Sequence, residues 1–365
     1  MPETPPAAVP SSPPASLSGG GGAVRPVDPL ADPSWDAGLA GRADASIFHG
    51  AAWARVLRET YGFAPFYLTE RDPSGRASLL PLLEANSWLT GRRGVSLPFT
   101  DECAPLCADD AACGRLFRAA RELARARGWR YLEFRGGRAR FGDVPASTSY
   151  FGHRLALRRD EAGLFAAVES STRRAVRKAE QGGLTVEVSA SPAAMEAFYR
   201  LLCRTRRRHG LPAQPFRFFR NLQRDLLAPG LGSIYLVRAA GVPVAGAVFF
   251  HFGATVLYKF GASDDRQQHL RPNNLLMWRA IADFAARGFA TLDFGRTSLG
   301  NDGLRRFKLG WGAEERRIDY VRYDCRADCW VTAPDSAAGW HNRIFRLLPV
   351  PLSRMAGAIL YKHVA

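Results

Sequence analysis

The sequence lacks the long apolar run that a membrane-spanning helix requires, since it contains no stretch of about 18 consecutive apolar residues. It also lacks a secretory signal, because Met1 to Leu17 is rich in Pro, Ala and Ser and has no basic segment followed by an apolar one. We therefore expect a cytoplasmic protein, with peripheral contact at the inner face of the plasma membrane as the alternative.

Cysteine is scarce, and the six cysteines do not form a metal-binding pattern. No CxxC pair occurs, and the two closely spaced pairs, Cys103 with Cys107 and Cys325 with Cys329, have no histidine near them in the sequence. We expect reduced, mostly structural thiols rather than a zinc site, and no bound metal.

Several catalytic signatures are also missing. The chain has no GxSxG, HExxH, Walker A or dinucleotide-binding glycine motif, so hydrolase, protease, ATPase and dehydrogenase functions have no positive support. Cys203 and His209 fall on one expected helix within an arginine-rich run, and we do not interpret them as a catalytic pair.

Basic residues, in contrast, are abundant. Lys and Arg number 50 against 34 Asp and Glu, which gives 50 − 34 = +16. This excess favours a polyanionic partner, such as nucleic acid, a nucleotide-linked or pyrophosphate-linked substrate, or an anionic membrane. A GC-rich genome is a second explanation, since arginine greatly outnumbers lysine.

The length of 365 residues and the hydrophobic content of 47% predict a globular protein with two domains. We expect residues 1–28 to form a disordered Pro/Ala/Gly-rich tail. The first α/β domain is placed at 29–155, the second at 156–325, and a C-terminal amphipathic segment at 326–365. Within the first domain, the apolar run SLLPLL (78–83) is predicted to be part of one strand over residues 76–84.

An internal repeat supports this division. ARGWRYLEF (126–134) and ARGFATLDF (286–294) match at an offset of 286 − 126 = 160 residues. Each follows an amphipathic helix and ends a predicted strand with Leu, an acidic residue and Phe. We interpret them as two copies of one α/β unit.

Only the second copy continues into an unusual segment, GFATLDFGRTSLGNDGLRRFKLGWG (288–312). A strand is followed by a glycine-containing loop, and Asn301 or Asp302 can cap a short basic helix. On this helix Arg305, Arg306 and Lys308 supply positive charge. The arrangement favours a site for an anionic or carbonyl-bearing substrate; the alternative is a surface turn beside an aromatic core contact.

In its second half the chain resembles the FemA/FemB/FemX peptidyltransferases and their CelD-type acetyltransferase relatives. The resemblance rests on an ordered set of segments: STRRAVRKAEQGGLTVEV (171–188), VLYKFGAS (256–263), PNNLLMWRAIADFAARG (272–288), residues 288–312 and IDYVRY (318–323). It implies two tandem GNAT-like domains, each a mixed central sheet flanked by helices, and an acyltransferase activity.

The resemblance also assigns site residues. Phe307 and Lys308 match a Phe-Lys pair that stabilises the transition state of acyl transfer, and a fixed ammonium at a developing oxyanion stabilises it by several kcal/mol. Tyr258 matches a substrate-facing tyrosine, with a packed strand aromatic as the alternative. No side chain stands out as a general base, so the acceptor's own amine is the expected nucleophile.

Other charged residues have two interpretations each. Arg174, Arg177 and Lys178 share one helical side and suit a phosphate or pyrophosphate, or else form a solvated face. Asp293 either orients Arg296 or the amine nucleophile, or makes a buried ion pair. We include Arg296 and Arg305 among the substrate-binding candidates.

The acyl donor stays open. Acetyl-CoA-dependent GNAT enzymes hold the pyrophosphate with a glycine-containing loop, yet RQQHLRPNNLL (266–276) contains no glycine. We expect no bound cofactor, with either aminoacyl-tRNA or acetyl-CoA as co-substrate. The acceptor implied by the resemblance is an anionic cell-envelope precursor, nucleotide-linked or lipid-linked, from peptidoglycan or exopolysaccharide synthesis. The alternative is a non-catalytic scaffold or RNA-binding protein of a polysaccharide export system.

The C-terminal segment 339–365 is predicted to form two short amphipathic helices separated by prolines. Their apolar face, edged with Arg and Lys, suits either docking on the first domain or contact with an anionic membrane.

Overall fold

The computed structural model describes residues 23–332 and 349–363. The helices are α1 (Trp35–Leu39), α2 (Ala51–Tyr61), α3 (Asp110–Arg127), α4 (Glu161–Ala167), α5 (Ser170–Gln181), α6 (Pro192–Arg208), α7 (Phe216–Leu222), α8 (Pro272–Ala286), α9 (Asp302–Leu309) and α11 (Val350–Leu360), with shorter turns at η1 (Ile47–His49), η2 (Arg138–Phe141), η3 (Gln223–Leu227) and η4 (Asp265–Leu270). The strands are β1 (Arg25–Val27), β2 (Ala64–Pro65), β3 (Tyr67–Arg71), β4 (Ala77–Leu80), β5 (Leu83–Ser87), β6 (Gly91–Ser96), β7 (Tyr131–Arg135), β8 (Thr148–Ala156), β9 (Thr185–Ser189), β10 (Gly232–Ala239), β11 (Val242–Phe252), β12 (Thr255–Ser263), β13 (Thr291–Ser298), β14 (Glu314–Asp324) and β15 (Cys329–Val331).

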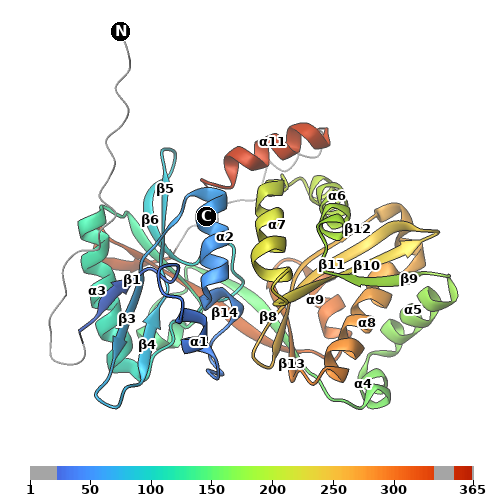
Figure 1. Cartoon of the computed structure of the whole chain (residues 1–365), viewed down its shortest axis with the longest axis horizontal. Helices are drawn as coiled ribbons and strands as arrows, with labels where there is room; N and C mark the ends of the chain where they lie inside the picture. The colour runs from blue at the N-terminus through green and yellow to red at the C-terminus, as the bar shows by residue number, and fades with distance from the viewer. Residues whose placement is uncertain (1–22, 333–348, 364–365) are drawn as a thin grey trace, which may run out of the picture.

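One large mixed sheet runs through both halves of the molecule (Figure 1). Its order is β2-β5-β6-β7-β14-β8-β13-β12-β11-β10-β9, with β15 paired to β14. A smaller sheet, β1-β3-β4, lies in the first half. The fold is therefore mixed α/β, as expected.

The repeat in the sequence corresponds to a repeat in the sheet. In the first unit α3 leads into β7, which is parallel to β6; in the second α8 leads into β13, which is parallel to β12. The strand after each repeated segment pairs with the other unit. β8, which follows β7, pairs with β13 of the second unit, and β14, which follows β13, pairs with β7 of the first. The two strands also pair with each other. The boundary expected at residue 155 consequently falls inside β8, a strand that joins the two units.

Two predictions about the first half are wrong. SLLPLL is not part of one strand: β4 ends at Leu80 in the small sheet, and β5 begins at Leu83 in the large one. Pro81 separates them, since proline fixes its backbone and cannot donate to a ladder. The expected disordered tail also extends too far, because Arg25–Val27 pair with β3.

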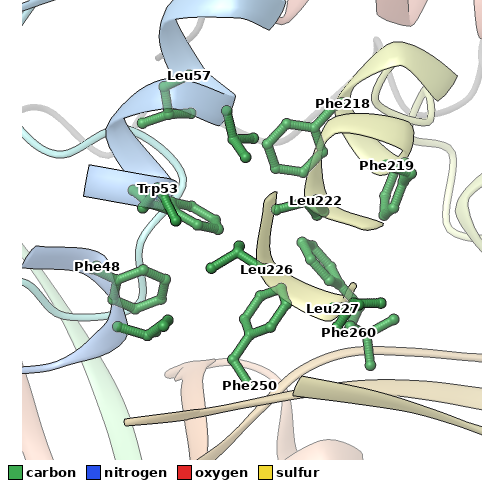
Figure 2. Close-up of a cluster of buried hydrophobic side chains, with 14 of the residues drawn as sticks. Phe48, Trp53, Leu57, Phe218, Phe219, Leu222, Leu226, Leu227, Phe250 and Phe260 are labelled. Carbon is green, nitrogen blue, oxygen red and sulfur yellow. The ribbon is translucent and has the colours of Figure 1, made fainter. Parts of the chain in front are cut away.

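The two halves share a hydrophobic core on one face of the large sheet. Trp53 on α2 packs edge-on against Phe218 on α7 at 6.1 Å and against Phe250 on β11 at 6.2 Å. Figure 2 shows these rings converging with leucines from η3. Two further clusters fill the opposite face, one under α3 and one under α5 and α8. The shared core holds the halves in a fixed relation.

The C-terminal helix α11 lies against α6 of the second half, and Tyr361 donates a hydrogen bond to the Pro212 carbonyl at 3.1 Å. The residues just after α11 contact the first half, where Ser87 forms a hydrogen bond with His363 at 2.8 Å. The first of the two predicted C-terminal helices, within 339–348, lies outside the described residues. Among the helices in the described ranges, none is long and apolar enough to cross a membrane.

The acidic residues of the repeat have equivalent structural roles. Glu133 on β7 bonds Arg322 at 2.8 Å and Arg135 at 2.9 Å, and Asp293 on β13 bonds Arg154 at 2.9 Å. Burial acts to raise the pKa of Glu133, but the two arginines outweigh it and lower this pKa to about 2. The repeated acid is thus a cross-strand ion-pair partner.

A pH-dependent stability follows from Glu133. Because its folded-state pKa lies below the ordinary value of 4.5, its contribution is present above that pH and is lost as pH falls toward about 2. We expect Glu133→Gln to be less stable than wild type near neutral pH, with a difference that narrows below pH 4.5. Urea unfolding across this range measures it. The exposed Glu196→Gln provides the control, and a pH-independent gap for Glu133→Gln would contradict the prediction.

Candidate active site

The sheet opens between β12 and β13 in the second unit. The two strands pair only from Thr255 with Thr291 to Leu257 with Asp293, although β12 continues to Ser263 and β13 to Ser298. Beyond this point they diverge around a cleft of about 840 Å³. Its lining comes from α6, β12, β13, the start of α8, α9, Tyr361 and the loop Phe99–Asp101 of the first half.

The matching opening of the first unit is filled. After β6 and β7 diverge, Cys103 donates its backbone N–H to the Arg135 carbonyl at 2.6 Å, which closes the space with the chain's own backbone. The copies have therefore diverged, and only the second presents two strand edges to a ligand.

Lys308 lies at the inner end of the cleft. Asn301 caps α9 by accepting a hydrogen bond from the Leu304 N–H at 3.1 Å, which confirms one of the two predicted caps. The Lys308 side chain is buried, and its Nζ donates to the Gly295 carbonyl at 3.0 Å and the Arg296 carbonyl at 3.2 Å. An ammonium has three N–H donors, so one is left for a bound group.

Burial lowers the pKa of Lys308 from its usual 10.5 to about 8, and the nearby Asp101 and Asp293 carboxylates partly oppose this shift. Phe307, the neighbouring residue, also lines the cleft and packs edge-on against Trp311 at 6.0 Å. Both residues of the predicted Phe-Lys pair therefore line the same cleft, and their role in acyl transfer stays a prediction.

A second buried lysine was missed by the sequence analysis. Lys259 on β12 donates to Asp101 at 2.5 Å and to the Phe99 carbonyl at 2.7 Å, which joins the two halves at the cleft. Burial acts to raise the pKa of Asp101, but Lys259, Arg296 and Lys308 outweigh it and hold this pKa below its usual value. Three cations thus surround one carboxylate, and the inner cleft is electropositive.

Arg296 is held by aromatic residues rather than by Asp293. Its guanidinium lies 4.4 Å from the centre of the Tyr150 ring and donates to the Tyr320 hydroxyl at 2.9 Å. Asp293 instead pairs with Arg154 and accepts the Gly295 N–H at 2.8 Å. The ion-pair interpretation of Asp293 holds, and its predicted role in orienting Arg296 is wrong.

Tyr258 packs on Phe249 at 5.4 Å, as the packed-aromatic alternative predicts, and it also lines the cleft, so that contact with a substrate stays a prediction. Burial raises its pKa to about 12. Arg305 does not line the cleft. It forms two hydrogen bonds to Glu315, at 2.7 and 2.8 Å, and stacks on Phe151 at 4.3 Å, so the structure gives it a partner within the protein.

The three residues of α5 that were predicted to bind phosphate lie outside the cleft. Arg174, Arg177 and Lys178 are exposed on a helix that packs against α8, and none of them lines the cleft. Arg177 stacks on Phe165 at 5.6 Å. The helical periodicity was right, but it describes a solvated face.

Other cations line the mouth of the cleft in their place. Arg206 and Arg208 come from the end of α6, and Arg271 immediately precedes α8. Asn273 and Asn274 add amide groups in the first turn of α8, where the helix dipole favours an anion. No group of three His, Cys, Asp or Glu suited to a metal occurs within 23–332 and 349–363.

Comparison with known proteins agrees with this geometry. Residues 166–317 match the family model described as an acetyltransferase (GNAT) domain. The crystal structure of FemX is similar over 78% of this chain and 94% of that chain, with a TM-score of 0.64 and 15% identity. A tandem GNAT protein from the clavulanic acid biosynthesis pathway is similar over 83% and 98%, with a TM-score of 0.51 and 14% identity.

A search of curated protein sequences found no significant match. Most of the residues that line the cleft lie in the segment that matches the acetyltransferase (GNAT) domain. The fold of the whole chain is similar to that of FemX and to that of the tandem GNAT protein.

Proposed function

We propose that this protein transfers an acyl or aminoacyl group to an amine or hydroxyl of an anionic cell-envelope precursor. The observation that carries the proposal is the buried Lys308 ammonium at the inner end of an electropositive cleft. A donor ester or thioester whose carbonyl oxygen meets the remaining Lys308 N–H is activated for attack. The same N–H then stabilises the oxyanion in water-poor surroundings, where such a contact is strongest.

The transfer needs no nucleophile from the protein. The acceptor amine or hydroxyl attacks the carbonyl carbon, the new C–N or C–O bond forms, and the donor's C–O or C–S bond breaks. The proton lost by the acceptor passes to the departing group. Asp101 lines the same cleft, and its carboxylate is paired with Lys259. We therefore assign it to holding an ammonium or hydroxyl of the acceptor in place, not to removing a proton.

Both donor classes fit the mouth of the cleft. Arg206, Arg208 and Arg271, with the first turn of α8, offer positive charge to a phosphate in place of the missing glycine loop. The tRNA backbone and the CoA pyrophosphate are both anions of this kind. Peptidoglycan and exopolysaccharide precursors supply the acceptor class, in nucleotide-linked or lipid-linked form.

A label-transfer assay tests the proposal. The full chain is incubated with labelled acetyl-CoA or aminoacyl-tRNA and with nucleotide-linked or lipid-linked precursors, and mass spectrometry follows the acceptor. We expect one donor to give a product dependent on Lys308. Failure of every pairing, together with salt-sensitive RNA binding, would favour the non-catalytic alternative.

The proposed role of Lys308 predicts how the transfer rate depends on pH. Because the pKa of Lys308 is lowered to about 8, the ammonium loses its proton as pH rises through that value, and the oxyanion loses its donor. We expect kcat to fall on the alkaline side with an apparent pKa near 8, well below the 10.5 of an ordinary lysine. A pH–rate profile measures this, and a rate that stays constant through about pH 8 to 10 would contradict it.

A further inference from the structure

The outer face of α11 is apolar. Leu352, Met355 and Ile359 follow one another at helical spacing and are 49%, 63% and 62% exposed. The inner face carries small residues instead, because Ser353 and Gly357 are buried. At Gly357 the packing is so close that a Cβ atom would lie 1.8 Å from the Ala213 carbonyl oxygen. A surface helix ordinarily packs through its large apolar residues, and α11 has the reverse arrangement.

A second element extends this apolar face. The β5–β6 hairpin exposes Trp88 (84%) and Leu89 (58%) at its tip. His363, just beyond α11, packs edge-on against Trp88 at 5.5 Å, and its carbonyl accepts a hydrogen bond from Arg93 at 3.0 Å. Figure 1 shows α11 and the β5 hairpin along the same edge of the molecule. We call these five exposed apolar residues and their flanking cations the α11–hairpin surface.

Positive charge surrounds the α11–hairpin surface. Arg92 and Arg130 are exposed at the hairpin, and Arg354 and Lys362 are exposed on and just after α11. Residues 349–363 contain no acidic residue. The only acid of the hairpin, Glu84, is buried and turned to Arg127 at 3.0 Å. On α11 and the β5–β6 hairpin, the exposed apolar side chains therefore have cationic neighbours and no exposed acidic ones.

This combination identifies the partner. Half of the ten large apolar side chains that are exposed in the described residues belong to the α11–hairpin surface. Contiguous exposed apolar groups mark an interaction site, and Trp with flanking Lys and Arg is typical of the interface of a bilayer. A second copy of the chain fits poorly, because it would bring one cationic rim against another and interface cores are depleted of charge.

We propose that the α11–hairpin surface docks on an anionic lipid bilayer. The apolar side chains insert at the level of the headgroups, and the four cations contact lipid phosphates. Docking does not depend on the proposed function. Docking would bring the bilayer close to the active-site cleft, because Tyr361, just after α11, lines this cleft and packs against Phe99 at 5.7 Å. If the transferase function holds, a lipid-linked acceptor would meet the cleft at this edge.

Vesicle co-sedimentation of the full chain tests the docking without donor or acceptor. The vesicles contain phosphatidylcholine alone or with phosphatidylglycerol. We expect wild type to bind the anionic vesicles, and the double variant Met355→Ser/Ile359→Ser to bind them at least about tenfold more weakly. Trp88→Ser should weaken binding independently. Since all three positions are exposed, unfolding temperatures should match wild type.

A matched control separates this surface from general hydrophobicity. Val188 and Val242 are 49% and 61% exposed at another part of the molecule, and Val188→Ser/Val242→Ser should bind like wild type. Wild type failing to sediment, equal binding to neutral vesicles, or equal loss in both double variants would overturn the proposal. So would light scattering that shows a wild-type dimer and a monomeric Met355→Ser/Ile359→Ser protein, since the surface would then pair two copies.

Discussion

Lys308→Ala is expected to lower kcat for acyl transfer by about 10²–10³-fold, the loss that follows removal of one oxyanion donor. The native ammonium is fixed by the Gly295 and Arg296 carbonyls, so it requires no reorganisation when the oxyanion forms. Because that interaction strengthens in the transition state, KM should change much less than kcat. Steady-state kinetics of the folded variant measure both constants.

Arg306→Ala is the matched control, because Arg306 is an exposed cation on the same helix and does not line the cleft. It should keep near-wild-type turnover. The alkaline fall near pH 8 should also be absent from the residual rate of Lys308→Ala. A folded Lys308→Ala protein with undiminished kcat would refute the assignment, whereas equal losses in both variants would indicate a general charge effect.

Much of the architecture could be predicted from local pattern. The helix–strand repeat was visible because Leu132 and Phe134 recur as Leu292 and Phe294, and all four side chains are buried on the strand that follows a long helix. The cap at Asn301 followed from short-range spacing, whereas Lys308 was assigned by the family resemblance. Such features depend on residues close in sequence, where periodicity and capping carry the information.

The completed site could not be predicted, because its parts come from distant segments. Asp101 belongs to the first half, and nothing in its neighbourhood indicates that it reaches Lys259 in the second. The exchange of β8 and β14 between the units also joins the two halves, and it leaves no periodic signal in the sequence. The α5 basic residues show why the sequence left two interpretations open, since a solvated helix face and a phosphate site have the same spacing.

Removing the Asp101 carboxylate is expected to destabilise the protein by about 3–5 kcal/mol, the loss that follows breaking a buried ion pair. In Asp101→Ala the Lys259 ammonium, whose side chain is only 6% exposed, keeps the Phe99 carbonyl but loses its counter-charge. Arg296 and Lys308, which also favour the charged form of Asp101, lose the same anion. Urea unfolding at neutral pH measures the free energy of unfolding.

The double variant Asp101→Ala/Lys259→Met distinguishes lost charge balance from lost packing. Lys259 lies over the rings of Phe48 and Trp53, 5.1 and 5.8 Å from their centres, so methionine can keep the apolar contact between the halves without a charge. We therefore expect the double variant to be more stable than Asp101→Ala.

An exposed pair provides the comparison. Arg204 and Asp264 are 3.2 Å apart, the arginine side chain is 58% exposed, and Arg204→Ala should cost at most about 1 kcal/mol. If Asp101→Ala cost no more than this, or if adding Lys259→Met lowered stability further, the pair would not be the charge-balanced junction between the two halves.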